Sequence, residues 1–206
     1  MTAFPNTHSS IRFQHSRFKL NRTVAASMSG GGRFNYTQIG EPFWTIDFTS
    51  VPLREKELAQ LEAWWSSLRD GLRSTLVTQN VTCRPFAHAN PANAAPAQDT
   101  GTLSSVTSGN VLNVASVASG LVLQPGDLIG LEKDAYRGLH RVVAVSGTGT
   151  TRAITVEPPP RSYVAVSGAV VRFENPELVM RPVPGSWAVN GLGRPQVSFQ
   201  LVESPK

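Results

Sequence analysis

Five side chains, four histidines and one cysteine, are of the types that most often bind metals or act as nucleophiles. His8, His15, His88 and His140 are scattered along the chain, and none lies four residues from another or beside a pair of cysteines. Metal sites usually draw on closely spaced ligands, so this spacing predicts none. Cys83 could pair with His88 or His140 as a nucleophile and its base, but no surrounding motif supports the pair. We therefore expect structural roles for these residues, and no metal or cofactor.

Three acidic residues lie close together in the sequence. Asp127, Glu132 and Asp134 could supply the carboxylate pair of a glycan hydrolase, or a weak cation site. They belong to a segment rich in turn residues, where acidic side chains are more often solvated. The sequence therefore favours a protein that is not an enzyme.

A glycine-rich stretch, MSGGGRF at residues 28–34, resembles a phosphate-binding loop only superficially. It matches neither GxxxxGK[ST] nor GxGxxG, and no helix is predicted to follow it. We interpret it as a turn.

Basic residues are concentrated near the N-terminus. Residues 1–40 contain no acidic residue, although the whole chain has a formal net charge of only +5. The basic residues of this arm are Arg12, Arg17, Lys19, Arg22 and Arg33. Such an arm can bind nucleic acid or an acidic surface of a neighbouring protein, or it can be a solvated extension.

Length and composition are those of a folded protein with one large or two small domains. The chain has 206 residues, of which 40% are hydrophobic. The single cysteine excludes an intramolecular disulfide, which fits a reducing compartment. No apolar run reaches the roughly 18 residues of a membrane span, and the first residues lack the order of a signal peptide. We expect a soluble protein.

One long amphipathic helix is predicted from about residue 53 to about residue 70, between Pro52 and Gly71. Apolar residues recur there at intervals of three and four and form one stripe: Leu58, Leu61, Trp65, Leu68 and Leu72. Trp64 lies at the margin of this stripe, where it would complete the core or contact a neighbouring subunit. On the charged face, Arg54, Glu57, Arg69 and Arg73 would meet solvent or a neighbouring subunit.

Strands are predicted on both sides of the helix. PFWTIDFTSV at residues 42–51 and RPQVSFQLVES at residues 194–204 alternate apolar and polar side chains, the period of a half-buried strand. The second of these has no local partner, so we expect it to pair with the N-terminal part of the chain. Residues 84–102 have the composition of a linker, and the short strand candidates between residues 103 and 182 indicate a small β-barrel or sandwich.

These elements predict a mainly β (α+β) protein. Residues 1–84 and 183–206 would form a core domain with one flanking helix, and residues 85–182 would form an inserted, peripheral β-rich domain. Insertions of this kind are tolerated where two chain ends meet at a surface.

The stretch FWTIDFTSVPLREKELAQLEAWWSSLRDGLRSTLVTQNVTCRP resembles the core of the minor tail and distal tail proteins of long-tailed bacteriophages. In that family a strand leads through a short loop to a helix of the form LExxxxxxxGxxxxF. Leu61, Glu62 and Gly71 are similarly placed here, with one more residue between Glu62 and Gly71 than in that form. Leu76 stands where an aromatic residue is frequent. LQPGDLIGLE, GLHRVV and ITVEPPPR are similar to stretches of related tail proteins.

The resemblance implies a tail-tube-like β-sandwich and a structural role in the virion. Such subunits assemble in the host cytoplasm into a ring, usually hexameric, with a trimer as the alternative, that joins the tail tube to the tail-tip hub. The implied partners are further copies of the chain, the tail tube protein and the hub protein, with the tape measure protein and tail fibres as additional candidates. A nucleic-acid-binding module is the alternative function. The candidate subunit-interface residues are Arg12, Arg17, Lys19, Arg22, Arg33, Arg54, Trp64, Arg69 and Arg73.

Overall fold

The computed structural model describes residues 2–4, 11–14, 16–79, 83–191 and 193–204. Strands contain 42% of the residues and helices 14%, which confirms the predicted mainly β class with one long helix and a small barrel. The chain divides into two compact units. We call Pro5–Arg73 with Arg181–Ser204 the sheet unit, and Ser74–Met180 with the first four residues the barrel unit. The chain passes between the two units at 73/74 and at 180/181, whereas the sequence placed the domain boundaries at 84/85 and 182/183.

The sheet unit is built on two strands that are far apart in the sequence. β5 (Phe43–Thr49) pairs antiparallel with β15 (Gln196–Glu203), which confirms that the last strand returns to the N-terminal part of the chain. β2 (Lys19–Asn21) pairs with the other side of β5, and β14 (Ala188–Asn190) pairs with β15. The alternation of the sequence places the apolar side chains of β5 and β15 in the core.

The long helix α1 spans Glu55–Ser67 and covers the apolar side of these strands. At its start the backbone N–H of Arg54 donates to Glu57 Oε2 at 2.8 Å, one half of a capping box. Leu61 and Leu68 are fully buried, and Trp64 is 9% exposed. Trp65 is only half-buried, so the two tryptophans exchange the places that the predicted stripe gave them.

The predicted helix is too long at its C-terminal end. After Ser67 the chain forms the 3-10 turn η2 (Arg69–Gly71), in which Arg69 and Asp70 have φ values of 49° and 51°. These left-handed residues break the helical period before it reaches Leu72. Leu72 is therefore 80% exposed, which corrects its assignment to the buried stripe.

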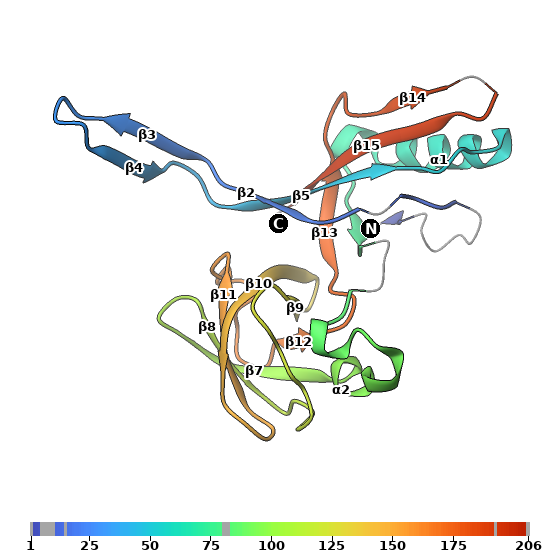
Figure 1. The fold of residues 1–206 in the computed structure, drawn as a ribbon. Helices are drawn as coiled ribbons and strands as arrows, with labels where there is room; N and C mark the ends of the chain where they lie inside the picture. Colours follow the sequence, from blue (N-terminus) through green and yellow to red (C-terminus); the bar gives the residue numbers. More distant parts are fainter. Residues whose placement is uncertain (1, 5–10, 15, 80–82, 192, 205–206) are drawn as a thin grey trace. The chain divides into compact units, whose positions relative to one another are not determined.

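A two-stranded ribbon extends from the sheet unit (Figure 1). β3 (Val24–Met28) pairs antiparallel with β4 (Phe34–Gln38), and the backbone N–H of Ile39 donates to Thr23 O at 2.9 Å. The ribbon, residues 22–40, thus continues the pairing of β2 with β5. Every residue of β3 and β4 is exposed.

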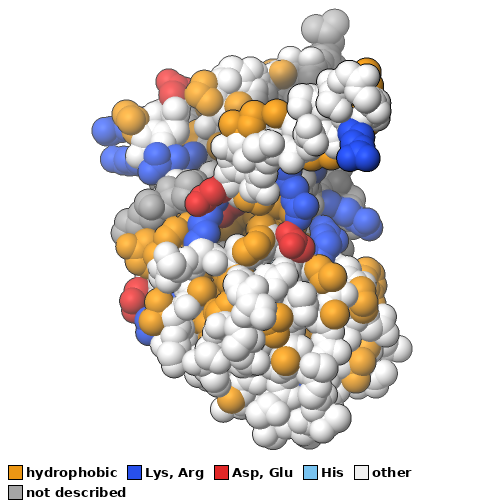
Figure 2. Space-filling view, turned by 90° about the vertical axis from the view of Figure 1, so that its left-hand side faces the viewer, with side chains coloured by type: hydrophobic (Ala, Val, Ile, Leu, Met, Phe, Trp, Pro, Cys, Tyr) orange, Lys and Arg blue, Asp and Glu red, His pale blue; other side chains and the backbone are white. Residues whose placement is uncertain are grey.

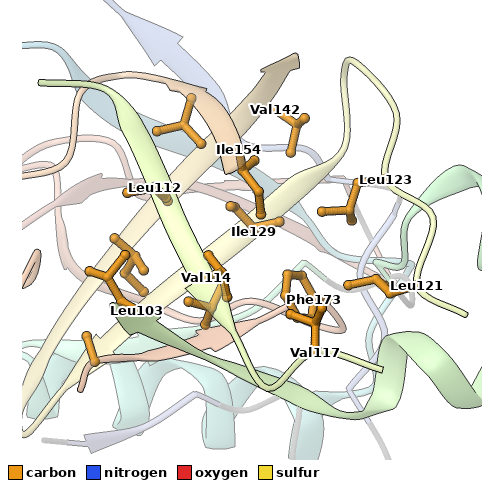
Figure 3. Close-up of a cluster of buried hydrophobic side chains, with 14 of the residues drawn as sticks. Leu103, Leu112, Val114, Val117, Leu121, Leu123, Ile129, Val142, Ile154 and Phe173 are labelled. Carbon is orange, nitrogen blue, oxygen red and sulfur yellow. The ribbon is translucent and has the colours of Figure 1, made fainter. Parts of the chain in front are cut away.

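The barrel unit contains a closed antiparallel barrel in the order β10-β11-β8-β7-β12-β9. Its strands are β7 (Thr100–Thr107), β8 (Val111–Ala115), β9 (Leu128–Lys133), β10 (Tyr136–Ser146), β11 (Arg152–Glu157) and β12 (Val170–Arg172). Figure 3 shows its core, where Leu103, Ile129 and Ile154 point toward one another. Not every apolar segment in the predicted series of short strands is a strand: residues 121–124 form none, although Leu121 and Leu123 are buried in this core.

Three further strands of the barrel unit lie outside the barrel. β6 (Thr75–Val77) pairs parallel with β1 (Thr2–Ala3) and antiparallel with β13 (Leu178–Pro182). Because β13 begins in the barrel unit and ends in the sheet unit, it carries the chain from one to the other.

The expected linker is ordered. It forms η3 (Phe86–His88), η4 (Pro91–Asn93) and the short helix α2 (Ala95–Gln98) before β7 begins. His88, which is buried, fixes this segment: its Nδ1 lies 2.7 Å from Asn93 O, and its Nε2 accepts the N–H of Val122 at 2.9 Å. Both ring nitrogens are therefore used within the fold.

Candidate interaction surface

The cysteine and histidines that could act as nucleophiles, bases or metal ligands have structural roles where the structure describes them. Cys83 donates its backbone N–H to Asn175 Oδ1 at 2.8 Å. Burial, and to a lesser degree the negative charge of Asp127, raise the pKa of its thiol to about 11. The thiol is therefore protonated at neutral pH and is a poor nucleophile. His88, one of its two expected partners, has both ring nitrogens bonded elsewhere.

His140, the other expected partner of Cys83, is buried in the barrel wall. Its Nδ1 lies 2.8 Å from Pro158 O, while its Nε2 is buried and has no hydrogen-bond partner in the described part of the chain. Burial lowers the pKa of His140 to about 4, so the ring is neutral at pH 7. His8 and His15 lie outside the described residues.

The three clustered acids have three different environments. Asp127 is buried and accepts the backbone N–H groups of Phe86 and Gln124 at 2.9 and 2.7 Å, which ties the ordered linker to the barrel. Glu132 accepts two hydrogen bonds from Arg172, at 2.6 and 3.2 Å. Asp134 is exposed in the turn between β9 and β10, with a φ of 51°.

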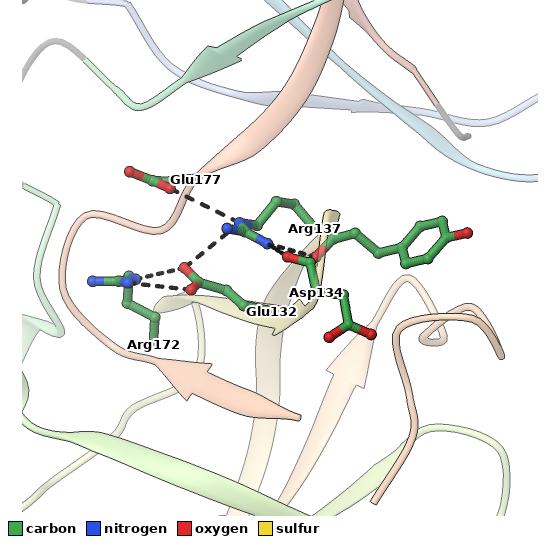
Figure 4. A network of polar contacts seen from close by, with 6 residues as sticks. Glu132, Asp134, Arg137, Arg172 and Glu177 are labelled. Carbon is green, nitrogen blue, oxygen red and sulfur yellow. Dashed lines mark hydrogen bonds and ion pairs between the residues drawn. The ribbon is translucent and has the colours of Figure 1, made fainter. Parts of the chain in front are cut away.

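An ion-pair network surrounds Glu132 (Figure 4). Arg137 lies 3.9 Å from both Glu132 and Glu177, and it donates to Asp134 O at 2.8 Å. These contacts occupy the carboxylate of Glu132 with cations of the same unit. Within the residues that the structure describes, no three His, Cys, Asp or Glu side chains gather closely enough to hold a metal ion.

The predicted interface residues fall into two groups and one exception. The five basic residues of the N-terminal arm are exposed, and Lys19 and Arg22 lie at the base of the ribbon. Arg54, Arg69 and Arg73 are exposed at the two ends of α1. Trp64 is the exception, because it packs against Phe199 in the core, with ring centroids 5.6 Å apart.

The ribbon carries an apolar face that was not predicted from the sequence. The register pairs Ala26 with Tyr36 and Met28 with Phe34, so these four side chains share one face. Val24 lies on the same face, two residues from Ala26. Met28, Phe34 and Tyr36 are 66%, 60% and 70% exposed, and the two rings stack with centroids 6.2 Å apart.

The opposite face of the ribbon is small and polar. It carries Ala25, Ser27, Asn35 and Thr37, which alternate with the apolar residues. Arg33 lies in the turn at the tip, outside both strands. Figure 2 shows basic and hydrophobic side chains exposed near one another on one face of the molecule. The ribbon therefore combines an apolar face with a basic periphery.

The signal for this face was present in the sequence as an alternation within residues 24–28 and 34–38. That alternation also predicts a strand whose apolar side is covered by its own chain, and only the structure shows that this side is exposed.

Comparisons of the chain with family profiles and with curated proteins returned no match. None of the helices in the described part of the chain has the length and apolar character needed to cross a bilayer.

Proposed function

We propose that this protein is a structural, non-catalytic subunit of a ring at the distal end of a phage tail, where it joins the tail tube to the tail-tip hub. The observation that carries the proposal is the ribbon, residues 22–40, whose apolar face is exposed in the isolated chain. A hairpin with one uncovered apolar face gains stability when a neighbour covers it.

Two further features support an assembly role. A ring requires a contact between two different surfaces that repeats around an axis, and a projecting element provides one of them. The sequence resemblance to distal tail proteins spans α1 and β5, and β5 is one of the two strands from which the ribbon extends. The barrel unit would give the ring a peripheral module for fibres or other tail proteins.

The test is the state of assembly of the purified chain. We expect closed rings of six copies, or of three, in negative-stain electron microscopy, with a matching mass in light scattering. On isolated phage tails, an antibody against the chain is expected to label the tip. A chain that stays monomeric at every concentration and is missing from tail tips would contradict the proposal.

The exposed basic residues favour one other function, nucleic-acid binding. Arg12, Arg17, Lys19, Arg22 and Arg33 are exposed in a segment without acidic residues. Under this alternative, affinity for DNA would fall steeply with salt and would be lost when all five are replaced by glutamine. Replacement of Arg54, Arg69 and Arg73 is the matched control, since these residues are equally exposed but lie at α1. Binding that is insensitive to the five replacements would exclude this function for the arm.

A further inference from the structure

The apolar face of the ribbon is comparable in size to the largest apolar patch of a typical monomer, and such patches are often functional. With about 150–250 Å² for each complete aromatic side chain, the exposed fractions of Phe34, Tyr36, Met28 and Val24 give on the order of 500 Å². The largest apolar patch of a typical monomer is about 300–600 Å², and one partner in a standard protein interface buries about 800 Å². The ribbon alone therefore supplies more than half of one partner's share of such an interface.

The distribution of charge argues for a protein partner on this face. Aromatic nucleic-acid sites place basic side chains among the rings that stack on the bases. Here the face between Val24 and Tyr36 has no charged side chain, since Arg22 precedes β3 and Arg33 lies at the tip. The basic residues therefore border the apolar face and do not interleave with it.

A second incomplete surface lies at the other end of the sheet unit. Among the strands that the structure describes, β14 pairs with β15 alone, all three of its residues are exposed, and Val189 is 43% exposed. The half-buried Trp187 precedes it and stacks on Phe199, with centroids 5.9 Å apart and an interplanar angle of 16°. An edge strand beside exposed apolar side chains is a template for pairing with another strand.

The two surfaces cannot meet within one copy. Ser198 of β15 pairs with Thr49 on one side and with Ala188 of β14 on the other, so β14 lies level with the end of β5. The ribbon joins β5 at Phe43, and at about 3.3 Å per residue the two surfaces are roughly 20 Å apart along the strand. The ribbon also points away from β14 (Figure 1).

We propose that the ribbon of one copy docks on the β14 edge of the next copy, where its apolar face covers Val189 and Trp187. The inference rests on the proposed ring and names the contact that would build it. Because the donor face and the acceptor edge are different and lie at opposite ends of one sheet, each copy can use both at once. Such a heterologous contact produces a closed ring when its rotation closes.

The first experiment crosslinks two different variants. In a Cys83→Ser background, one chain carries Asn35→Cys on the polar face of the ribbon, and a second, size-tagged chain carries Asn190→Cys on β14. A short bis-maleimide is expected to join them only in the mixture. Thr148→Cys, in an exposed loop of the barrel unit, replaces Asn190→Cys as the control and is expected to give no product.

The second experiment removes the apolar face. Phe34→Ser with Tyr36→Ser is expected to weaken assembly by on the order of a hundredfold or more, because two central aromatic residues are lost. Asn35→Ala with Thr37→Ala alters the opposite face of the same strand and is expected to leave assembly intact. Tryptophan fluorescence verifies that each variant is folded.

The outcomes separate the two proposals. Rings that form without the Asn35–Asn190 product, or that survive loss of both aromatics, would overturn the docking site and leave the ring in place. A wild-type chain that never assembles would overturn both. Loss of binding to anionic vesicles or to single-stranded DNA in the aromatic variant, with assembly unchanged, would assign the face to a different partner and would also overturn the inference.

Discussion

The buried ring of His140 makes the stability of the barrel depend on pH. Burial lowers the pKa of His140 from 6.5 to about 4, so the unfolded chain takes up this proton more readily than the folded one. The resulting stabilisation is complete above about pH 6.5 and is lost as the pH falls toward 4.

We expect His140 to cost the protein about 3 kcal/mol of unfolding free energy between pH 7 and pH 4. Urea denaturation of the wild type and of His140→Gln at both pH values measures it, and the difference between the two losses isolates the histidine from the carboxylates that titrate in the same range. An equal loss in both proteins would show that His140 is not the group responsible.

Asp127 stabilises the ordered linker through two backbone hydrogen bonds. Asp127→Ala leaves the N–H groups of Phe86 and Gln124 without their acceptor, and we expect it to lower the unfolding free energy by about 2–3 kcal/mol. Asp99→Ala, at an exposed position, is the control and is expected to change it by less than about 0.5 kcal/mol. Chemical denaturation followed by circular dichroism compares the two.

At the scale of elements, the predicted helix contains a matched pair of leucines, one inside α1 and one beyond its end. Leu61 and Leu72 belong to the same predicted stripe, but Leu61 is fully buried and Leu72 is 80% exposed. We expect Leu61→Ala to cost about 3 kcal/mol and Leu72→Ala less than about 0.5 kcal/mol. Equal costs would mean that the helix continues to Leu72 in solution.

The elements whose patterns were local could be predicted from the sequence. Alternation located β5 and β15, and the lack of a local partner for β15 predicted its return to β5. The end of α1 could not be predicted, because the heptad-like spacing continues to Leu72 while the left-handed conformations of Arg69 and Asp70 end the helix. The ordered conformation of residues 84–99 could not be predicted either, because it depends on hydrogen bonds of His88 and Asp127 to partners that are distant in the sequence.

The candidate site was predicted less well than the fold. The basic residues were identified because charge is visible in the sequence. The apolar face of the ribbon was missed because alternation predicts a strand but not the layer that covers it. For the same reason the sequence could not decide whether Trp64 belongs to the core or to an interface, and the structure places it in the core.

At the scale of the whole molecule, the two units have separate spectroscopic reporters. The chain has four tryptophans, at positions 44, 64, 65 and 187, and all of them belong to the sheet unit. The barrel has its own hydrophobic core, and Tyr136 and Tyr163 pack against it.

We therefore expect the two units to unfold in separate transitions. Leu103→Ala opens a cavity in the barrel core, and we expect it to lower the midpoint of the barrel's transition, measured by circular dichroism. The midpoint measured by tryptophan fluorescence is expected to stay unchanged. If both midpoints shift together, the units unfold as one cooperative structure.

The pairing of β6 with β13 has a consequence for engineering. Val77 and Leu178 face each other as an antiparallel pair, so their Cα atoms lie about 5 Å apart. A two-residue turn could join them as an ordinary hairpin and remove everything between. We expect the shortened chain to keep its tryptophan emission and its cooperative unfolding. The barrel would then be an exchangeable cassette, and other small domains with adjacent ends could be fitted in its place.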